Sequence, residues 1–178
     1  MNLWSGKKVK LRQATQDDYL IYTDSNFDTD VQKLYDKIEF PLSIENIKET
    51  IKKSMDNSGD DFLFAVENTD GELVGQVITF DCDRRMGNFK FGLFVLPAYQ
   101  GKGYAKEAVN IVLDYYFNQL RYHKANVYIY DCNEKSQKFH ESLGFSREGV
   151  LRETSFFDGK YHDTVYYGII DREFNSKK

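Results

Sequence analysis

The sequence predicts an α/β (α+β) fold: a mixed, mostly antiparallel, seven-stranded twisted sheet with helices on both faces. Residues 91–97 are apolar and aromatic, as in a buried strand, and a glycine-bearing turn connects them to a helical repeat of apolar residues. The Asp-Gly pairs at 70–71 and 158–159 are typical of hairpins, which make neighbouring strands antiparallel. A helix separates the strands at 91–97 and 127–130, so these two strands are expected to be parallel.

Length and composition limit the possible functions. With 178 residues, 41% of them hydrophobic and 29% charged, the chain fits a single domain over 1–178 with a core at 8–171. The net charge of −4 argues against nucleic acid as the main partner and is compatible with a cationic one. We see no signal peptide and no run near the roughly 20 apolar residues that span a bilayer, so we expect a cytoplasmic protein without a membrane partner. Cys82 and Cys132 lack metal-ligand spacing and are expected to be free thiols, with no metal site.

The N-terminal half is expected to supply four strands and two helices. The strands are placed at 8–13, 62–67, 73–80 and 87–96. The helices are placed from an N-cap at Thr15 to about Phe27, and from Ser43 to Ser58-Gly59. Gly75 marks a candidate β-bulge in its strand. The acidic segment 24–61 is interpreted either as a solvated helical face or as a wall that attracts amines.

The C-terminal half alternates between helix and strand and ends in a hairpin. A helix is expected from the glycine turn to about Leu120, followed by a buried strand at 127–130. The segment Asp131-Cys132-Asn133 is expected to cap a helix that starts at Glu134 and stops at Gly144. The last hairpin is placed at 146–157 and 161–170, and the tail 175–178 is expected to fray.

The turn that follows residues 91–97 is expected to hold a diphosphate. It reads Gln100-Gly101-Lys102-Gly103-Tyr104-Ala105. The first turn of a helix has unpaired N–H groups, glycines let phosphates approach this backbone, and Lys102 and Lys106 add positive charge. The Walker A pattern fails because no Lys-Ser/Thr pair follows Gly103. The dinucleotide-binding fingerprint also fails, because Lys106 stands where its third glycine belongs.

Two motifs in this order resemble the GCN5-related N-acetyltransferase (GNAT) superfamily. Residues 97–105 contain Gln-x-x-Gly-x-Ala after a strand that ends in Pro, which is similar to the family's acetyl-CoA-binding motif. Residues 133–145 contain Asn-x-x-Ser and then a short helix ending in Leu-Gly-Phe, which is similar to a second segment of these enzymes. The resemblance covers 9–170 and is strongest over 93–145. It points to two branches, the polyamine acetyltransferases and the ribosomal-protein N-terminal acetyltransferases.

The resemblance implies a V-shaped slot between two diverging parallel strands, with acetyl-CoA as the co-substrate. The backbone of Leu93, Phe94 and Val95 is implied to hold the pantetheine arm and the acetyl carbonyl, and Asn133 to contact the same arm. The residues implied to bind the pyrophosphate are Gln100, Gly101, Lys102, Gly103, Tyr104, Ala105 and Lys106. A strand-bulge N–H near Phe94 or Val95 is a candidate donor to the oxyanion of the tetrahedral intermediate.

The chemistry needs a proton acceptor and a proton donor. An alkylamine has a pKa of roughly 10, so a base or a water chain must take its proton before it attacks the thioester. Asp81 and Asp83 are the nearest carboxylate candidates for that base. In many relatives a Tyr protonates the departing thiolate, and here that position is His140; in others it is the Ser of the second motif, here Ser136. The alternatives are a packing role for His140 and an ordinary first-turn role for Ser136.

The remaining candidates have a structural interpretation, and those of the last hairpin have a functional alternative taken from the family resemblance. His123 and His162 are interpreted as strand-edge or hairpin residues. Tyr161, Asp163 and Tyr166 are either ordinary strand residues or part of an acceptor-cleft wall in the last hairpin.

The resulting hypothesis is an enzyme that transfers an acetyl group from acetyl-CoA to a primary amine by direct attack in a ternary complex. The expected acceptor is a polyamine or a protein or peptide N-terminus, and an aminoglycoside is an alternative. A non-catalytic acyl-CoA-binding or sensing domain is the second hypothesis, to which the His at position 140 and the lack of a carboxylate in residues 87–96 lend slight support. A flavodoxin-like nucleotide-binding protein is a third, which the two predicted hairpins contradict. The exposed edges of the last hairpin are compatible with a homodimer.

Overall fold

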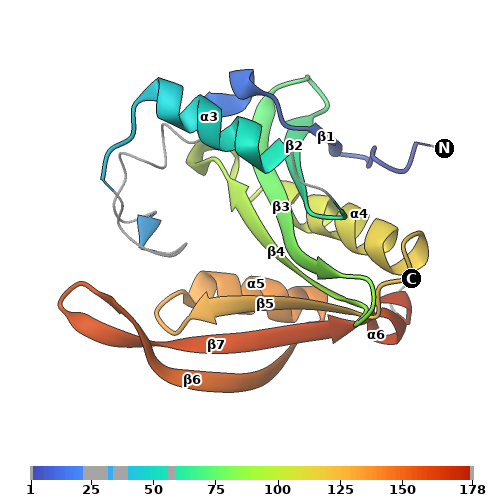
Figure 1. The fold of residues 1–178 in the computed structure, drawn as a ribbon. Helices are drawn as coiled ribbons and strands as arrows, with labels where there is room; N and C mark the ends of the chain where they lie inside the picture. The colour runs from blue at the N-terminus through green and yellow to red at the C-terminus, as the bar shows by residue number, and fades with distance from the viewer. Residues whose placement is uncertain (1, 22–31, 34–39, 56–58, 177–178) are drawn as a thin grey trace.

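Seven strands form one mixed sheet in the order β1-β2-β3-β4-β5-β7-β6 (Figure 1). The structure is a computed structural model that describes residues 2–21, 32–33, 40–55 and 59–176. The strands are β1 (Val9–Gln13), β2 (Phe62–Asn68), β3 (Leu73–Asp83), β4 (Asn88–Val95), β5 (Lys124–Tyr130), β6 (Ser146–Phe157) and β7 (Lys160–Ile170). The helical elements are η1 (Gln16–Tyr19), α3 (Ile44–Met55), η2 (Pro97–Tyr99), α4 (Tyr104–Asn118), α5 (Glu134–Leu143) and α6 (Asp171–Asn175).

Helices cover both faces of the sheet, as predicted. On one face, buried residues of α4 and α5 join one core with alternate residues of the strands. This core includes Val109, Val112, Leu113, Leu143, Phe89, Val127, Ile129, Val165, Tyr167 and Ile169. On the other face, Ile47 and Ile51 of α3 pack with Leu63 and Ala65 of β2. We call these two sides the α4/α5 face and the α3 face.

The predicted strands and helices are confirmed, with shifts at their ends. β3 and β5 are longer than expected, and α4 ends at Asn118. The N-cap at Thr15 is confirmed by a capping box with Asp18, but the helix there begins as the short 3-10 turn η1. Residues 20–21 continue it as helix, and the rest of the predicted helix, residues 22–27, lies outside the described residues. The bulge near Gly75 is confirmed by a register shift between β2 and β3.

The C-terminal tail was expected to fray over residues 175–178, but Asn175 is the last residue of α6 and Ser176 is its C-cap; residues 177–178 lie outside the described residues. Phe174 of this helix is buried. The ring of Phe174 lies 5.6 Å from that of Phe117 in α4, so aromatic packing holds this short helix against the core.

β4 and β5 form the parallel pair of the sheet, and they are hydrogen-bonded only where they start. Their paired residues are Asn88 with Lys124, Phe89 with Ala125, and Lys90 with Asn126. Beyond these pairs, β4 remains paired with β3 and β5 with β7. The two strands therefore diverge, as Figure 1 shows. We call the space between them the slot, with a closed end at Lys90 and an open end at Val95 and Tyr130.

Candidate active site

The turn at the open end of the slot leads β4 into α4 through two glycines in the left-handed region. Gly101 has φ 77° and Gly103 has φ 85°, a conformation that costs other residues strain. Gly103 is the N-cap of α4, and no side chain caps this helix start. The backbone N–H groups of its first turn therefore lack a side-chain acceptor and face a glycine-lined, exposed turn. This is the arrangement that the sequence predicted for a diphosphate site.

Lysines surround this turn. Nζ of Lys8 donates a hydrogen bond to the carbonyl of Lys102 at 2.9 Å, and Nζ of Lys102 lies 4.9 Å from the centre of the Tyr99 ring. Glu107, in the first turn of α4, accepts hydrogen bonds from the backbone N–H groups of residues 7–9 at 2.6–3.0 Å. Its carboxylate ties the start of β1 to α4 and brings Lys8 to the turn. Sequence reasoning missed this contact, because the two segments are about 100 positions apart.

Gln100 bridges the two sides of the slot. Its Nε2 donates to the carbonyl of Val95 at 3.0 Å, and its Oε1 accepts from Nζ of Lys135 in α5. Both polar ends of this side chain are thus engaged within the protein. Gln100 therefore fixes the turn, and its phosphate contact stays a prediction.

The β4 segment that lines the slot is regular. Leu93 and Val95 are half-buried and Phe94 is buried. Pairing with β3 is continuous from Phe91 to Val95, so the β-bulge expected near Phe94 is wrong. Gly75 of β3 allows a close approach instead, because a Cβ there would lie 2.4 Å from the carbonyl oxygen of Phe94. The register of β4 is therefore fixed by its neighbour strand.

The side chain of the N-cap residue, Asn133, caps the start of α5. Oδ1 of Asn133 accepts a hydrogen bond from the backbone N–H of Ser136 at 3.1 Å. This leaves the amide N–H groups of Asn133 as donors on a half-buried residue. The hydroxyl of Ser136, also half-buried, lies one turn before His140, with Oγ 3.4 Å from His140 Nδ1.

His140 is a buried residue in an aromatic environment. It is 6% exposed, and its ring lies 5.1–5.8 Å from those of Phe91, Phe139 and Phe145. Nδ1 donates to the carbonyl of Ser136 at 2.8 Å, so in the neutral ring the proton sits on Nδ1. Burial lowers the pKa of His140, although the Ser136 carbonyl opposes this shift. A neutral ring with an unprotonated Nε2 is a poor proton donor, and the geometry favours the packing alternative.

The two aspartates considered as bases have other partners. Asp81 pairs with Nζ of Lys90 at 2.9 Å, and Asp83 accepts from the backbone N–H of Met86 in the next turn at 2.9 Å. Both follow the part of β3 that pairs with Lys90, so they lie at the closed end of the slot. Two aspartates of the acidic segment 24–61 also have partners within the protein. Asp60 pairs with Arg84 and Tyr122, and Asp61 accepts a hydrogen bond from the Cys82 N–H. The other aspartates of that segment lie outside the described residues.

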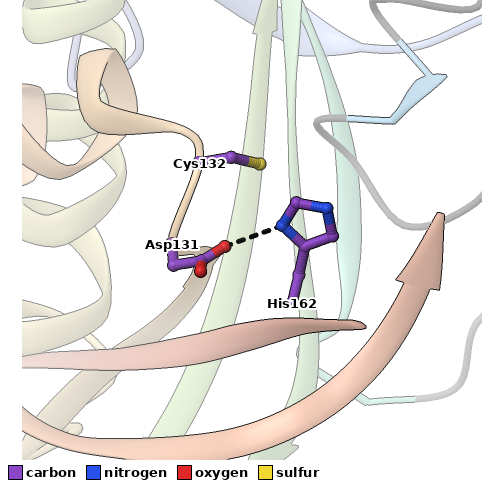
Figure 2. Close-up of side chains that lie close together, drawn as sticks. All are labelled: Asp131, Cys132 and His162. Carbon is purple, nitrogen blue, oxygen red and sulfur yellow. Dashed lines mark hydrogen bonds and ion pairs between the residues drawn. The ribbon is translucent and has the colours of Figure 1, made fainter. Parts of the chain in front are cut away.

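A second polar group, not predicted as a unit, lies where β5 ends. Asp131, Cys132 and His162 bring one polar atom each to within 4.8 Å of one another (Figure 2). Nδ1 of His162 is 2.9 Å from Oδ1 of Asp131, and the His162 ring stacks on that of Phe157 at 3.9 Å. The alternation of buried and outward-facing residues along β7 was the sequence signal that could have placed His162. Core residues at 165, 167 and 169 place His162 on the opposite, α3 face of the sheet.

The chain was compared with known proteins. Residues 8–146 match the family model described as acetyltransferase (GNAT) domain. The "SPbeta prophage-derived uncharacterized N-acetyltransferase YokL" of Bacillus subtilis is 36% identical over 96% of this chain and 94% of its own length. The spermidine N(1)-acetyltransferase of Escherichia coli K12 is 29% identical over 96% of this chain and 90% of its own.

The similarity extends to solved structures. The spermidine N-acetyltransferase of Vibrio cholerae, in complex with CoA and spermine, aligns with a TM-score of 0.85 and 26% identity. That alignment covers 96% of this chain and 99% of the other. The helices of the part of the chain that the structure describes do not combine the length and the hydropathy that a bilayer-spanning helix needs.

Proposed function

The chain belongs to the acetyltransferase (GNAT) family and transfers acetyl groups from acetyl-CoA to amines, and from this premise we propose that its acceptor is a polyamine such as spermidine. The observation that carries the proposal is the match to spermidine N-acetyltransferases along nearly the whole chain, in sequence and in fold. The two strands that diverge at residues 91–95 and 127–130 supply the slot that this reaction needs.

The start of α4 is the proposed seat of the pyrophosphate. The N–H groups that follow Gly103 point to a turn with no side-chain cap, and the helix dipole favours an anion there. Lys8, Lys102 and Lys106 supply positive charge around it. The pantetheine arm then runs into the slot past Leu93, Phe94 and Val95, where the amide of Asn133 is a donor for one of its carbonyls. These roles rest on geometry and family resemblance together.

Ser136 is the proposed donor to the leaving thiolate. A thiol has a pKa of about 8.5, so a thiolate is a stable leaving group near neutral pH and a hydrogen bond assists its departure. The Ser136 hydroxyl always carries a proton, whereas the neutral ring of His140 presents an unprotonated Nε2. We therefore assign donation to Ser136 and packing to His140.

The acceptor is proposed to approach from the α3 face, across from α4 and α5. On this face, Tyr128 of β5 lies 6.4 Å from Phe80 and 6.2 Å from Tyr166, measured between ring centres. Nζ of Lys90 already lies 5.9 Å from the Tyr128 ring centre, so these rings accommodate a cation. Asp131 adds a carboxylate at the open end of the slot. Aromatic faces and negative charge suit a flexible polycation.

An acceptor screen tests the proposal. The purified protein is incubated with acetyl-CoA and, separately, spermidine, spermine, peptides with a free α-amino group, and an aminoglycoside. Thiol release gives the rate and mass spectrometry identifies the product. We expect kcat/KM for the polyamines to exceed that for every other amine by about tenfold or more, which corresponds to about 1.4 kcal/mol. Efficient acetylation of peptides or the aminoglycoside with little polyamine turnover would contradict the proposal.

A further inference from the structure

One buried nitrogen lacks a hydrogen-bond partner within the part of the chain that the structure describes, and it is Nε2 of His162. His162 is 4% exposed. A buried polar atom without a partner costs roughly 1–3 kcal/mol. Such atoms are rare in folded proteins, and a catalytic role is one recognised reason for them.

The partner of the other ring nitrogen determines the state of Nε2. Nδ1 of His162 lies 2.9 Å from Oδ1 of Asp131 (Figure 2). Burial opposes ionisation of Asp131, but hydrogen bonds from His162 and from nearby backbone N–H groups hold the pKa of this carboxyl below its usual range. An ionised carboxylate only accepts hydrogen bonds, so Nδ1 carries the hydrogen. In the neutral ring, Nε2 is therefore an unprotonated nitrogen with a free lone pair.

The position of His162 matches the acceptor side of the reaction. Val165, Tyr167 and Ile169 of β7 belong to the core under α4 and α5, so His162 points to the α3 face. Its ring stacks on Phe157, which in turn lies 5.3 Å from Tyr130, the last residue of β5. Asp131 follows directly, at the open end of the slot. The pair thus lies across the sheet from the helices that flank the proposed cofactor site.

We propose that His162 is the general base of acetyl transfer and that Asp131 is its positioning residue. The inference rests on acetyl transfer to an amine and not on the choice of a polyamine. Nε2 takes one proton from the ammonium group of the acceptor, directly or through one water molecule, and the ring becomes imidazolium beside the Asp131 carboxylate. The neutral amine attacks the thioester carbonyl, a C–N bond forms and the C–S bond breaks. The Ser136 hydroxyl gives its proton to the thiolate and takes up the second amine proton in its place, and His162 returns the first to solvent.

A cation bound by Asp131, Cys132 and His162 is the competing explanation, which the geometry disfavours. Nδ1 already donates a hydrogen bond to the carboxylate, and Nε2, which has the free lone pair, lies on the side of the ring away from Asp131 (Figure 2). Burial, followed by the negative charge of Asp131, raises the pKa of the Cys132 thiol and so opposes the thiolate that a metal would need.

Titratable groups from two segments lie near His162. Asp131 and Cys132 face it from the segment after β5. Asp158 lies in the β6–β7 turn and Lys160 is the first residue of β7; both charges act on Cys132, and Asp158 pairs with Lys33 at 2.8 Å. Asp131 is the one of these groups that is hydrogen-bonded to the ring, so its carboxylate is the group that orients the imidazole.

The test compares two acceptors with different amine pKa values. The wild-type protein, His162→Gln and Asp131→Asn are assayed from pH 6 to 10 with a polyamine, of amine pKa about 10, and with a peptide amide, of α-amino pKa about 8. Cys132→Ser is the matched control beside the pair. We expect His162→Gln to lower kcat/KM for the polyamine by about 10²–10⁴-fold at neutral pH. The loss is expected to shrink at high pH and with the peptide amide, while KM for acetyl-CoA stays unchanged.

The outcomes separate the explanations. An equal loss at every pH and with both acceptors would overturn the proposal in favour of a structural role, as would an unchanged His162→Gln variant. Loss of activity with a chelator, restored by Zn²⁺ and abolished in Cys132→Ser, would establish the cation instead.

If His162→Gln does not fold, ¹⁵N NMR of the wild-type imidazole decides, since a protonated Nε2 at pH 8 contradicts the proposal. If the wild type acetylates only non-polyamine amines, the polyamine assignment fails and the His162 test proceeds with those amines.

Discussion

The two helices that follow the diverging strands start in opposite ways. α4 begins after Gly103, a left-handed glycine, and no side chain caps it. α5 begins after Asn133, whose side chain accepts a hydrogen bond from the third residue of the helix. Both starts follow strands that line the same slot, so their positions in the topology are equivalent.

The difference indicates which start is available to a ligand. At α5, the helix satisfies part of its own N-terminus, and the segment contributes side chains to the site. At α4, the backbone donors lack a side-chain acceptor, and the glycines leave room for phosphate oxygens. A helix start without a cap is a stability cost that a bound anion offsets. We infer that α4 holds the charged part of the cofactor and α5 orients the reacting part.

The largest effect on acetyl-CoA binding is expected when a glycine of the turn before α4 is given a side chain. Gly101→Ala and Gly71→Ala form a matched pair, because the glycines have φ 77° and 81° and neither substituted Cβ meets an atom within 4 Å. Each variant should lose roughly 1–2 kcal/mol of stability to backbone strain. Only Gly101→Ala should raise the Kd of acetyl-CoA, by about tenfold or more, measured by calorimetry. Equal Kd values for the two variants would remove the α4 turn from the cofactor site.

A second variant tests whether His140 packs the inside of α5. Burial lowers the pKa of His140 in the folded protein, so the unfolded chain binds the proton more readily. Folding stability should therefore fall as the pH falls below the unfolded pKa of about 6.5. Relative to His140→Leu, the wild type should lose up to about 1.4 kcal/mol per pH unit in that range, measured by urea unfolding. Parallel pH curves for the two proteins would show that His140 is not buried as a neutral ring.

Asn133 separates helix capping from cofactor contact. Asn133→Ala should cost about 1 kcal/mol, a Tm decrease of roughly 2–4 °C, because α5 loses its cap. Asn133→Asp keeps the capping oxygen and should restore most of the Tm, yet it lacks the amide N–H donors. If those donors hold the pantetheine arm, Asn133→Asp should still weaken acetyl-CoA binding in calorimetry. Wild-type affinity in Asn133→Asp would confine Asn133 to capping.

The smallest effect on acetyl-CoA binding is expected from removing the charge of a single lysine. Lys106→Gln, in the first turn of α4, should raise the Kd of acetyl-CoA by about two- to fivefold at low salt and less at high salt, as an exposed charge does. Lys138→Gln is the control on α5, where Lys138 pairs with Glu134 at 3.1 Å. Its Kd should match that of the wild type at all salt concentrations. A comparable, salt-dependent loss in Lys138→Gln would mean that the positive charge of α5 also faces the phosphates.

The sequence predicted those features that depend on local patterns. Alternation and Asp-Gly turns gave the strands, glycines gave the start of α4, and Asn133 was placed correctly at the start of α5. The divergence of β4 and β5 followed from the family resemblance, and the register confirms it. The reaction class also followed from that resemblance.

The remaining features depend on contacts between distant segments. Asp131 meets His162 only because β5 and β7 pair in one particular register, and Gln100 meets Lys135 across the slot. The burial of His140 required knowing which side of α5 faces Phe91. The regular register near Phe94 depends on Gly75 in the adjacent strand. No local pattern encodes these pairings, and Asp81 and Asp83, the base candidates from the sequence, lie at the closed end of the slot.

The most direct measurement is an NMR titration of the ¹⁵N-labelled protein with acetyl-CoA, following the backbone amides of both helix starts. Our account predicts that the largest shifts occur at residues 101–106, at the start of α4, with smaller shifts at 133–136. Shifts confined to 133–136, or no shifts at saturating acetyl-CoA, would contradict it.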